Sequence, residues 1–172
     1  MSWLDRIEKD SPRERKTLIL AVIIAVVMVV IDQWTKWFFI NNYELGETSP
    51  LIPGILNFTY VRNLGAAWSI LSGKVWLLLL FGIAAGAVMI YYFRKLAEGC
   101  VERYYALLLV ISGIAGNSFD RAFHGSVIDF IHVHYYDSWH YPVFNVADMA
   151  ICIGVGIYLI SGFCRKSSEP EK

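Results

Sequence analysis

The chain has 172 residues, of which 56% are hydrophobic and 17% are charged, and its mean hydropathy is +0.48. A soluble domain is usually about 25% charged and lacks several apolar runs of about 20 residues, so this composition excludes an ordinary soluble globule and a disordered chain. Lysine plus arginine balance aspartate plus glutamate at 15 each, which leaves no basic field for nucleic acid, and three cysteines cannot form a disulfide framework. A small polytopic membrane protein remains.

Four segments are long and apolar enough to cross a bilayer as helices, which takes about 20 residues. They cover residues 17–40, 74–93, 104–123 and 144–163. The sequence therefore predicts an all-α integral membrane protein with four transmembrane helices in one domain, residues 1–172, since lipid requires every backbone group to be paired internally. The first span is not expected to be a cleaved signal peptide, because its apolar run is too long and it carries Asp32 and Lys36.

The distribution of basic residues predicts the orientation. Eleven of the 15 lysines and arginines lie in the N-terminal tail, in the connection between the second and third spans, or in the C-terminal tail. The other two connections, residues 41–73 and 124–143, together hold one, Arg62. Because basic residues concentrate on the cytoplasmic side, both termini are expected in the cytoplasm and the two long connections outside.

The longer outer connection, residues 41–73, predicts a small extracytoplasmic platform between the first two helices. Residues 49–54 contain Ser-Pro and Pro-Gly pairs that indicate a turn, and the β-branched and aromatic residues 55–61 predict a short strand. Residues 62–68 begin too polar for lipid, and a short helix that rests on the bilayer is expected there. The second outer connection contains all four histidines.

Polar and ionisable side chains within the spans gather at one depth. An ionisable side chain costs roughly 2.5–3.5 kcal/mol at the bilayer centre, so each one needs a structural or functional reason. In the predicted orientation they all lie near the outer ends of the first, third and fourth spans. They are Asp32, Lys36, Asn117, Asp120, Arg121, Asn145 and Asp148, and Asp129 follows just beyond the third span. One polar cluster that opens outward is the economical interpretation.

Structural roles compete with function for most of this set. Asp32 and Lys36 stand four residues apart and can simply pair on one helix face. Asp120 can form an ion pair with Arg121, or Arg121 can extend to the headgroups. Asn117 and Asn145 can join helices by hydrogen bonds. Asp148 has no basic residue within two turns on its own helix, which favours a functional role.

Two other chemistries have little support in the sequence. His132 and His134 form an H-x-H pair near His124 and His140, but neither H-E-x-x-H nor Cys-x-x-Cys occurs, so no metal and no cofactor are predicted. A serine nucleophile is not predicted either, because G-x-S-x-G is absent from the sequence and no lysine on the second or fourth span is placed as its base.

Two neighbouring carboxylates can hydrolyse a peptide bond without a metal or a covalent intermediate. They cannot both ionise easily, so one keeps a proton near neutral pH. The charged one can take a proton from water, and the protonated one can donate to the carbonyl oxygen or the leaving amine. Spacing alone leaves the pair open among Asp32, Asp120, Asp129 and Asp148.

Five short blocks give the sequence a family resemblance. They are DQWTK (32–36), RNLGAA (62–67), GNSFDR (116–121), VIDF (127–130) and FNVAD (144–148). In this order, on a chain of this length with four spans, they resemble the lipoprotein signal peptidases (signal peptidase II), which are bacterial membrane aspartic proteases. Each block alone is weak, and all five together are highly specific.

The resemblance implies a role for each block. Asp129 and Asp148 match the catalytic aspartates of the family. Substrate binding or support of the site falls on Asn63, Gly65, Asn117, Arg121, Asn145 and Ala147. Structural polar roles fall on Asp32, Lys36 and Asp120, with Asp120 expected to pair with Arg121. No metal is implied.

The resemblance also implies the substrate and the location. The substrate class is a prolipoprotein that already carries a diacylglyceryl group on its lipobox cysteine, and cleavage falls just before that cysteine. Membrane lipids and globomycin-type inhibitors are further expected partners, nucleic acid is not, and a monomer is expected. The protein would be a multi-pass protein of the bacterial cytoplasmic (inner) membrane, with its active site near the extracytoplasmic face.

Two non-proteolytic interpretations remain open on the residues alone. An ion-coupled transporter also places carboxylates within spans, but no inverted repeat is visible and the polar residues do not lie at the midplane. A non-catalytic assembly subunit would use the aspartates to join helices. Both interpretations predict that replacing Asp129 or Asp148 spoils transport or assembly without abolishing any proteolysis.

Overall fold

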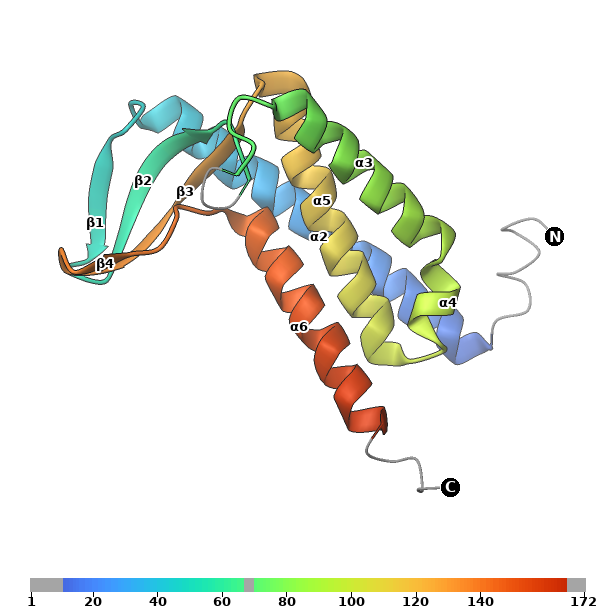
Figure 1. Cartoon of the computed structure of the whole chain (residues 1–172). Coiled ribbons are helices and arrows are strands. Elements are labelled where there is room, and N and C mark those ends of the chain that lie inside the picture. The colour runs from blue at the N-terminus through green and yellow to red at the C-terminus, as the bar shows by residue number, and fades with distance from the viewer. Residues whose placement is uncertain (1–10, 67–69, 167–172) are drawn as a thin grey trace.

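The computed structural model describes residues 11–66 and 70–166. A bundle of long helices carries a small antiparallel sheet that flares from one end, while α2 begins and α6 finishes at the other end (Figure 1). In chain order the elements are α2 (Pro12–Asn42), β1 (Thr48–Ile52), β2 (Leu56–Asn63), α3 (Val75–Tyr91), α4 (Phe93–Ala97), α5 (Val101–His124), β3 (Val127–Tyr135), β4 (Trp139–His140) and α6 (Val146–Lys166).

Among the described residues, three helices are long and apolar enough to cross a membrane, namely α2, α5 and α6. The fourth apolar helix, α3, has 17 residues, which is slightly short of the usual span of about 20. It finishes at Tyr91 and the chain continues as the separate helix α4. The chain therefore has three to four membrane-spanning helices and a small sheet, and the fourth span stays a prediction.

The helix ends follow from local sequence. Ser11 and Glu14 form a capping box at the start of α2, with Pro12 in the first turn, so this helix begins five residues before the predicted span. Directly after α5, Gly125 adopts a left-handed conformation with φ +66°. That conformation favours glycine and stops the helix, so the chain can turn into β3.

The sheet joins two connections that lie far apart in the chain, residues 41–73 and 124–143. Its strand order is β1-β2-β3-β4, with antiparallel neighbours. The register places Val61 opposite Asp129 and Asn63 opposite Val127. The strand predicted at residues 55–61 is thus present as β2. Strand β3 was not predicted, because it pairs with β2 far away in the sequence. Strand β1 was not predicted, because residues 49–54 carry turn signals, whereas the structure confines the turn to residues 53–55, and β4 has only two residues.

The short helix expected at residues 62–68 is not found in its described part. Residues 62 and 63 belong to β2, and residues 64–66 are bends. The side chain of Asn63 accepts a hydrogen bond from the backbone N–H of Gly65 over 2.9 Å. This Asx turn lies where the predicted helix would begin. The remainder of that prediction, including Trp68, lies outside the described residues.

Small residues let α5 lie close to its neighbours. A β-carbon built on Gly113 would overlap the carbonyl oxygen of Ala147 in α6, and one built on Gly116 would lie 2.5 Å from Oδ2 of Asp32 in α2. Close helix contacts at small residues are typical of membrane bundles. The large apolar side chains of α2, α3 and α6 instead face outward, where lipid would surround them.

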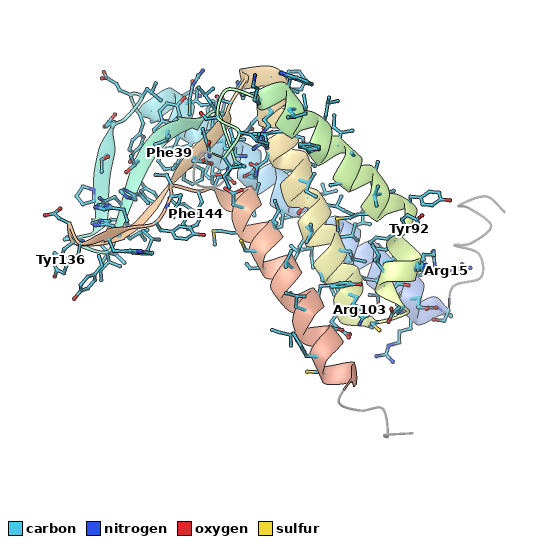
Figure 2. All side chains as sticks on the ribbon, viewed as in Figure 1. Arg15, Phe39, Tyr92, Arg103, Tyr136 and Phe144 are labelled. Carbon is cyan, nitrogen blue, oxygen red and sulfur yellow. The ribbon has the colours of Figure 1, made fainter. Side chains whose placement is uncertain are left out.

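Aromatic packing attaches the sheet to the bundle. Phe39, near the end of α2, stacks on Phe130 of β3 with ring centroids 4.3 Å apart. Tyr60 and Ile128 complete this buried cluster. Phe39 and Phe144 both lie where the sheet meets the helices in Figure 2. This contact fixes the start of β3, and hence Asp129, next to the helices.

Candidate active site

The two aspartates singled out by the sequence lie on different elements at the junction of sheet and bundle. Asp129 is the third residue of β3 and is 2% exposed. Asp148 lies in the first turn of α6 and is half-buried. Phe144 pairs with Ile131 through backbone hydrogen bonds, so the chain runs beside β3 immediately before α6 begins. This bridge brings the two segments together.

The start of α6 is held by side chains at both ends of its first turn. The backbone N–H of Asp148 donates to Oδ1 of Asn145 over 2.9 Å, and the backbone N–H of Asn145 donates to Oδ2 of Asp148 over 3.2 Å. The backbone N–H of Ala147 donates to Oδ1 of Asp32 over 2.8 Å. Carboxylates are stabilised at a helix N-terminus, where unpaired N–H groups converge. Three hydrogen bonds therefore hold the turn that carries Asp148.

Three asparagines donate hydrogen bonds to the two carboxylates. Asn145 donates to Oδ1 of Asp129 over 2.7 Å, and Asn63 of β2 donates to Oδ2 over 2.9 Å. Asn117 of α5 donates to Oδ1 of Asp148 over 2.7 Å. Asn145 also donates to the side-chain oxygen of Asn117 over 3.1 Å. The carboxylates thus belong to one continuous hydrogen-bond network that draws on β2, β3, α5 and α6.

The environment of Asp129 favours its protonated form. Burial, and then the nearby charge of Asp148, raise the pKa of Asp129 from 3.8 to about 7, although hydrogen bonds from Asn63 and Asn145 oppose the rise. A buried carboxylic acid that keeps its proton near neutral pH is typical of acid–base sites. The titration is a property of the pair as a whole.

A hollow of about 180 Å³ opens onto both aspartates. Its other lining residues include the apolar Val143, Phe144 and Ile151. A second hollow of about 470 Å³ also reaches Asp129 and is lined by polar as well as apolar side chains. The site therefore has an apolar approach to Asp148 and a wider, more polar approach on the side of the sheet.

A buried ion group lies beside the carboxylates. The ammonium of Lys36 is 2.8 Å from Oδ2 of Asp32 and 2.9 Å from Oδ2 of Asp120. Asp32 and Lys36 therefore form the pair that their spacing allows. The expected pairing of Asp120 with Arg121 is wrong, because consecutive helix residues project in different directions and Asp120 faces Lys36. Asp120 also accepts a hydrogen bond from the backbone N–H of Ile128.

Arg121 joins α5 to the connection between α2 and α3. Its guanidinium donates to the backbone carbonyl of Gly65 over 3.2 Å and to that of Asn117 over 3.4 Å. It also lines the smaller hollow. All the residues singled out by the sequence as site residues thus meet in one region. Gln33, which bridges Asp32 and Asp120 by donating 3.1 Å hydrogen bonds to both, was overlooked, although it lies in the first block.

The histidines of the second connection form a separate cluster. The rings of His132 and His140 stack with centroids 5.3 Å apart, and His132 Nε2 and His140 Nδ1 are 3.2 Å apart. Burial, and then His134 and His140, lower the pKa of His132. Within residues 11–66 and 70–166, no set of three or more histidine, cysteine or acidic side chains is arranged to hold a metal ion.

The fold defines a multi-pass membrane protein, and comparisons with known proteins give its family. The model of the Signal peptidase (SPase) II family matches residues 24–164. The chain belongs to the signal peptidase II family.

Relatives match over most of the chain. The lipoprotein signal peptidase of Bacillus velezensis is 41% identical over 153 residues, which are 89% of this chain and 99% of the relative. The lipoprotein signal peptidase of Halalkalibacterium halodurans is 40% identical over 138 residues, which are 80% and 88% of the two chains. A solved bacterial membrane enzyme is 35% identical with a TM-score of 0.81, and the match covers 89% of this chain and 93% of that one.

Proposed function

We propose that this protein is an aspartic endopeptidase that removes the signal peptide from prolipoproteins, with Asp129 and Asp148 as its catalytic pair. The observation that carries the proposal is that these two carboxylates, from β3 and α6, share one asparagine network beside a hollow. Membership of the signal peptidase II family supports the reaction class.

The roles of the two aspartates follow from their surroundings. Asp129 is buried, and its raised pKa of about 7 favours the protonated form, so the role of base is assigned to Asp148. Asp148 takes a proton from a water molecule as the water oxygen attacks the peptide carbonyl carbon. Asp129 donates its proton to the carbonyl oxygen, which forms a tetrahedral diol.

The second half of the reaction returns the protons. When the carbon–nitrogen bond breaks, the proton held by Asp148 passes to the leaving amine, and a hydroxyl proton of the diol returns to Asp129. Asn63 and Asn145 hold the Asp129 carboxyl through hydrogen bonds of 2.9 and 2.7 Å, so little rearrangement is needed between the steps. No covalent enzyme intermediate is required.

This chemistry is proposed to take place near the extracytoplasmic surface of the membrane. In the proposed arrangement four helices form a single membrane domain with both termini in the cytoplasm, and the sheet with its connections lies on the extracytoplasmic side of the bacterial inner membrane. Concentration of basic residues away from the sheet supports this orientation. The carboxyl groups of Asp129 and Asp148 then lie where the end of a membrane-inserted signal peptide emerges.

The substrate is proposed to be a diacylglyceryl-modified prolipoprotein, cleaved just before its lipidated cysteine. The names of the relatives support the lipoprotein class. The outward-facing apolar surfaces of the helices allow the acyl chains to remain in the bilayer while the peptide reaches the smaller hollow. Inhibitors of the globomycin type are expected to compete for this site, and the enzyme is proposed to act as a monomer.

The test uses purified protein in detergent and two prolipoproteins that differ only in the diacylglyceryl group. We expect release of the signal peptide from the lipidated substrate alone, with the cut immediately before the cysteine as measured by mass spectrometry. Absence of cleavage by well-folded protein would contradict the proposed reaction. Equal cleavage of both substrates would contradict the proposed substrate class.

A further inference from the structure

The ammonium of Lys36 has no spare hydrogen-bonding capacity. The side chain is 2% exposed, and its three N–H groups have three acceptors, at 2.8 Å on Asp32, 2.9 Å on Asp120 and 3.1 Å on Oδ1 of Asn117. One of the two aspartates would already neutralise the ammonium. The third contact is not needed for charge balance, and it points toward the catalytic pair.

The contact with Lys36 determines which way the amide of Asn117 is turned. An ammonium only donates, so the atom of Asn117 that faces it must be the amide oxygen. The Asn145 amide donates to the same oxygen over 3.1 Å. The NH₂ group of Asn117 is therefore forced to the opposite side, where it donates to Oδ1 of Asp148 over 2.7 Å.

A rotated amide would be damaging at this position. Rotation by 180° would put an NH₂ group against the ammonium and an amide oxygen against the carboxylate of Asp148. Two donors or two acceptors would then face each other in a buried region, which costs free energy in each case. Asn117 is 6% exposed, so water cannot easily relieve the mismatch.

We propose that Lys36 is a positioning residue for catalysis: by fixing the amide orientation of Asn117, it holds Asp148 in the geometry in which that carboxylate activates water. Lys36 does not touch the substrate and acts only through Asn117. The inference rests on the proposed catalytic role of Asp148, and it adds to the charge-neutralising role that the ion pairs alone would give Lys36.

Three variants separate positioning from charge balance. Lys36→Met removes the ammonium and leaves two buried carboxylates, so both the melting temperature and kcat should fall. Lys36→Met combined with Asp120→Asn keeps the net charge of the wild-type group, so most of the melting temperature should return while kcat stays low. Asp120→Asn alone keeps the Lys36–Asn117 contact and serves as the matched control. Its melting temperature should fall, because the new NH₂ group meets the donor of Gln33 or those of Lys36 and Ile128, whereas its kcat should stay well above that of either Lys36 variant.

The expected size of the effect is a fall of about 100-fold in kcat for both Lys36 variants, since a displaced catalytic group typically costs this much. KM should change by less than about threefold, because the proposal gives Lys36 no role in binding. In a double-mutant cycle with Asn117→Leu, the second substitution should cause little further loss of kcat. Wild-type cleavage of the lipidated substrate is the reference for every comparison.

Three results would overturn the positioning role. Recovery of kcat together with the melting temperature in the charge-balanced variant would assign Lys36 to neutralisation alone. Fully multiplicative losses in the cycle with Asn117→Leu would show that the two residues act separately. Failure of both Lys36 variants to melt cooperatively would make Lys36 a requirement for folding only. Failure of the proposed function itself is distinct, because the wild type would then not cleave.

Discussion

The side-chain amide of Asn145, directly before α6, donates a 2.7 Å hydrogen bond to Oδ1 of Asp129 in β3. The side-chain oxygen of Asn145 accepts from the backbone N–H of Asp148 over 2.9 Å. One fully buried side chain therefore sets the position of both carboxylates. It connects the strand that carries one to the helix that carries the other.

We expect Asn145→Ala to lower the melting temperature and to reduce kcat by at least about 100-fold, because both carboxylates lose a fixed partner. Each buried polar group left unpaired costs about 1–3 kcal/mol of unfolding free energy. Thermal melts and single-turnover cleavage measure the two effects. Asn42→Ala is the matched control, since the Asn42 amide donates to a backbone carbonyl at the exposed end of α2. Equal activity of the two variants would contradict the bridging role.

The activity should depend on pH through Asp129. The proposed reaction needs this residue protonated, and burial together with the charge of Asp148 raises its pKa to about 7. Activity measured as kcat/KM is therefore expected to fall as the pH rises through about 7, in a profile recorded from pH 5 to 9. A profile that stays flat across this range would mean that the essential proton is not held at Asp129.

The raised pKa of Asp129 also predicts how the stability of the fold changes with pH. The folded protein binds the Asp129 proton more tightly than the unfolded chain does, whose corresponding pKa is 3.8. The resulting stability is complete below pH about 4 and is lost as the pH rises through about 7. Asp129→Asn cannot ionise, so its melting temperature relative to wild type should increase over that interval and level off above it. A difference that is independent of pH would contradict the buried, protonated state.

The close approach of α5 to α2 can be tested at one glycine. In Gly116→Ala the new methyl group would lie 2.5 Å from Oδ2 of Asp32, which forces the ion group and the start of α6 to shift. We expect a loss of about 1–3 kcal/mol in unfolding free energy and a fall in activity. Gly156→Ala is the control, because its methyl group would meet no atom within 4 Å and alanine favours the helix. Similar behaviour of the two variants would argue against tight packing at Gly116.

The meeting of the polar residues at one end of the helices could be predicted from the sequence, because span length and rise per residue put them at corresponding heights. Asp32, Asn117 and Asp148 fall at the same end of three apolar segments, and the structure joins them through hydrogen bonds. The partner of Asp120 could not be predicted, since adjacency in sequence suggested Arg121 whereas the direction of the side chain selects Lys36. Spacing along one helix constrains i and i+4 neighbours, but it says little about contacts between helices.

The sheet was the largest feature missed. Only β2 had a recognisable strand pattern, and β3 was seen as a histidine-rich connection. Strand β3 forms because Phe130 packs on Phe39 and because its backbone pairs with β2, about 70 residues earlier in the chain. The register that places Asp129 opposite Val61 follows from this long-range pairing. From spacing alone the catalytic pair stayed open among four aspartates, and only the resemblance selected Asp129 and Asp148.

The central claim is that Asp129 and Asp148 together perform the cleavage. The most direct test compares signal-peptide release from a lipidated prolipoprotein by wild type, Asp129→Asn and Asp148→Asn, with Asp137→Asn as a control in the exposed turn between β3 and β4. We expect wild-type and control activity to be equal, to be unaffected by a metal chelator, and to fall by at least about 1,000-fold in each of the other two folded variants. Cleavage that survives either of these substitutions would contradict the account.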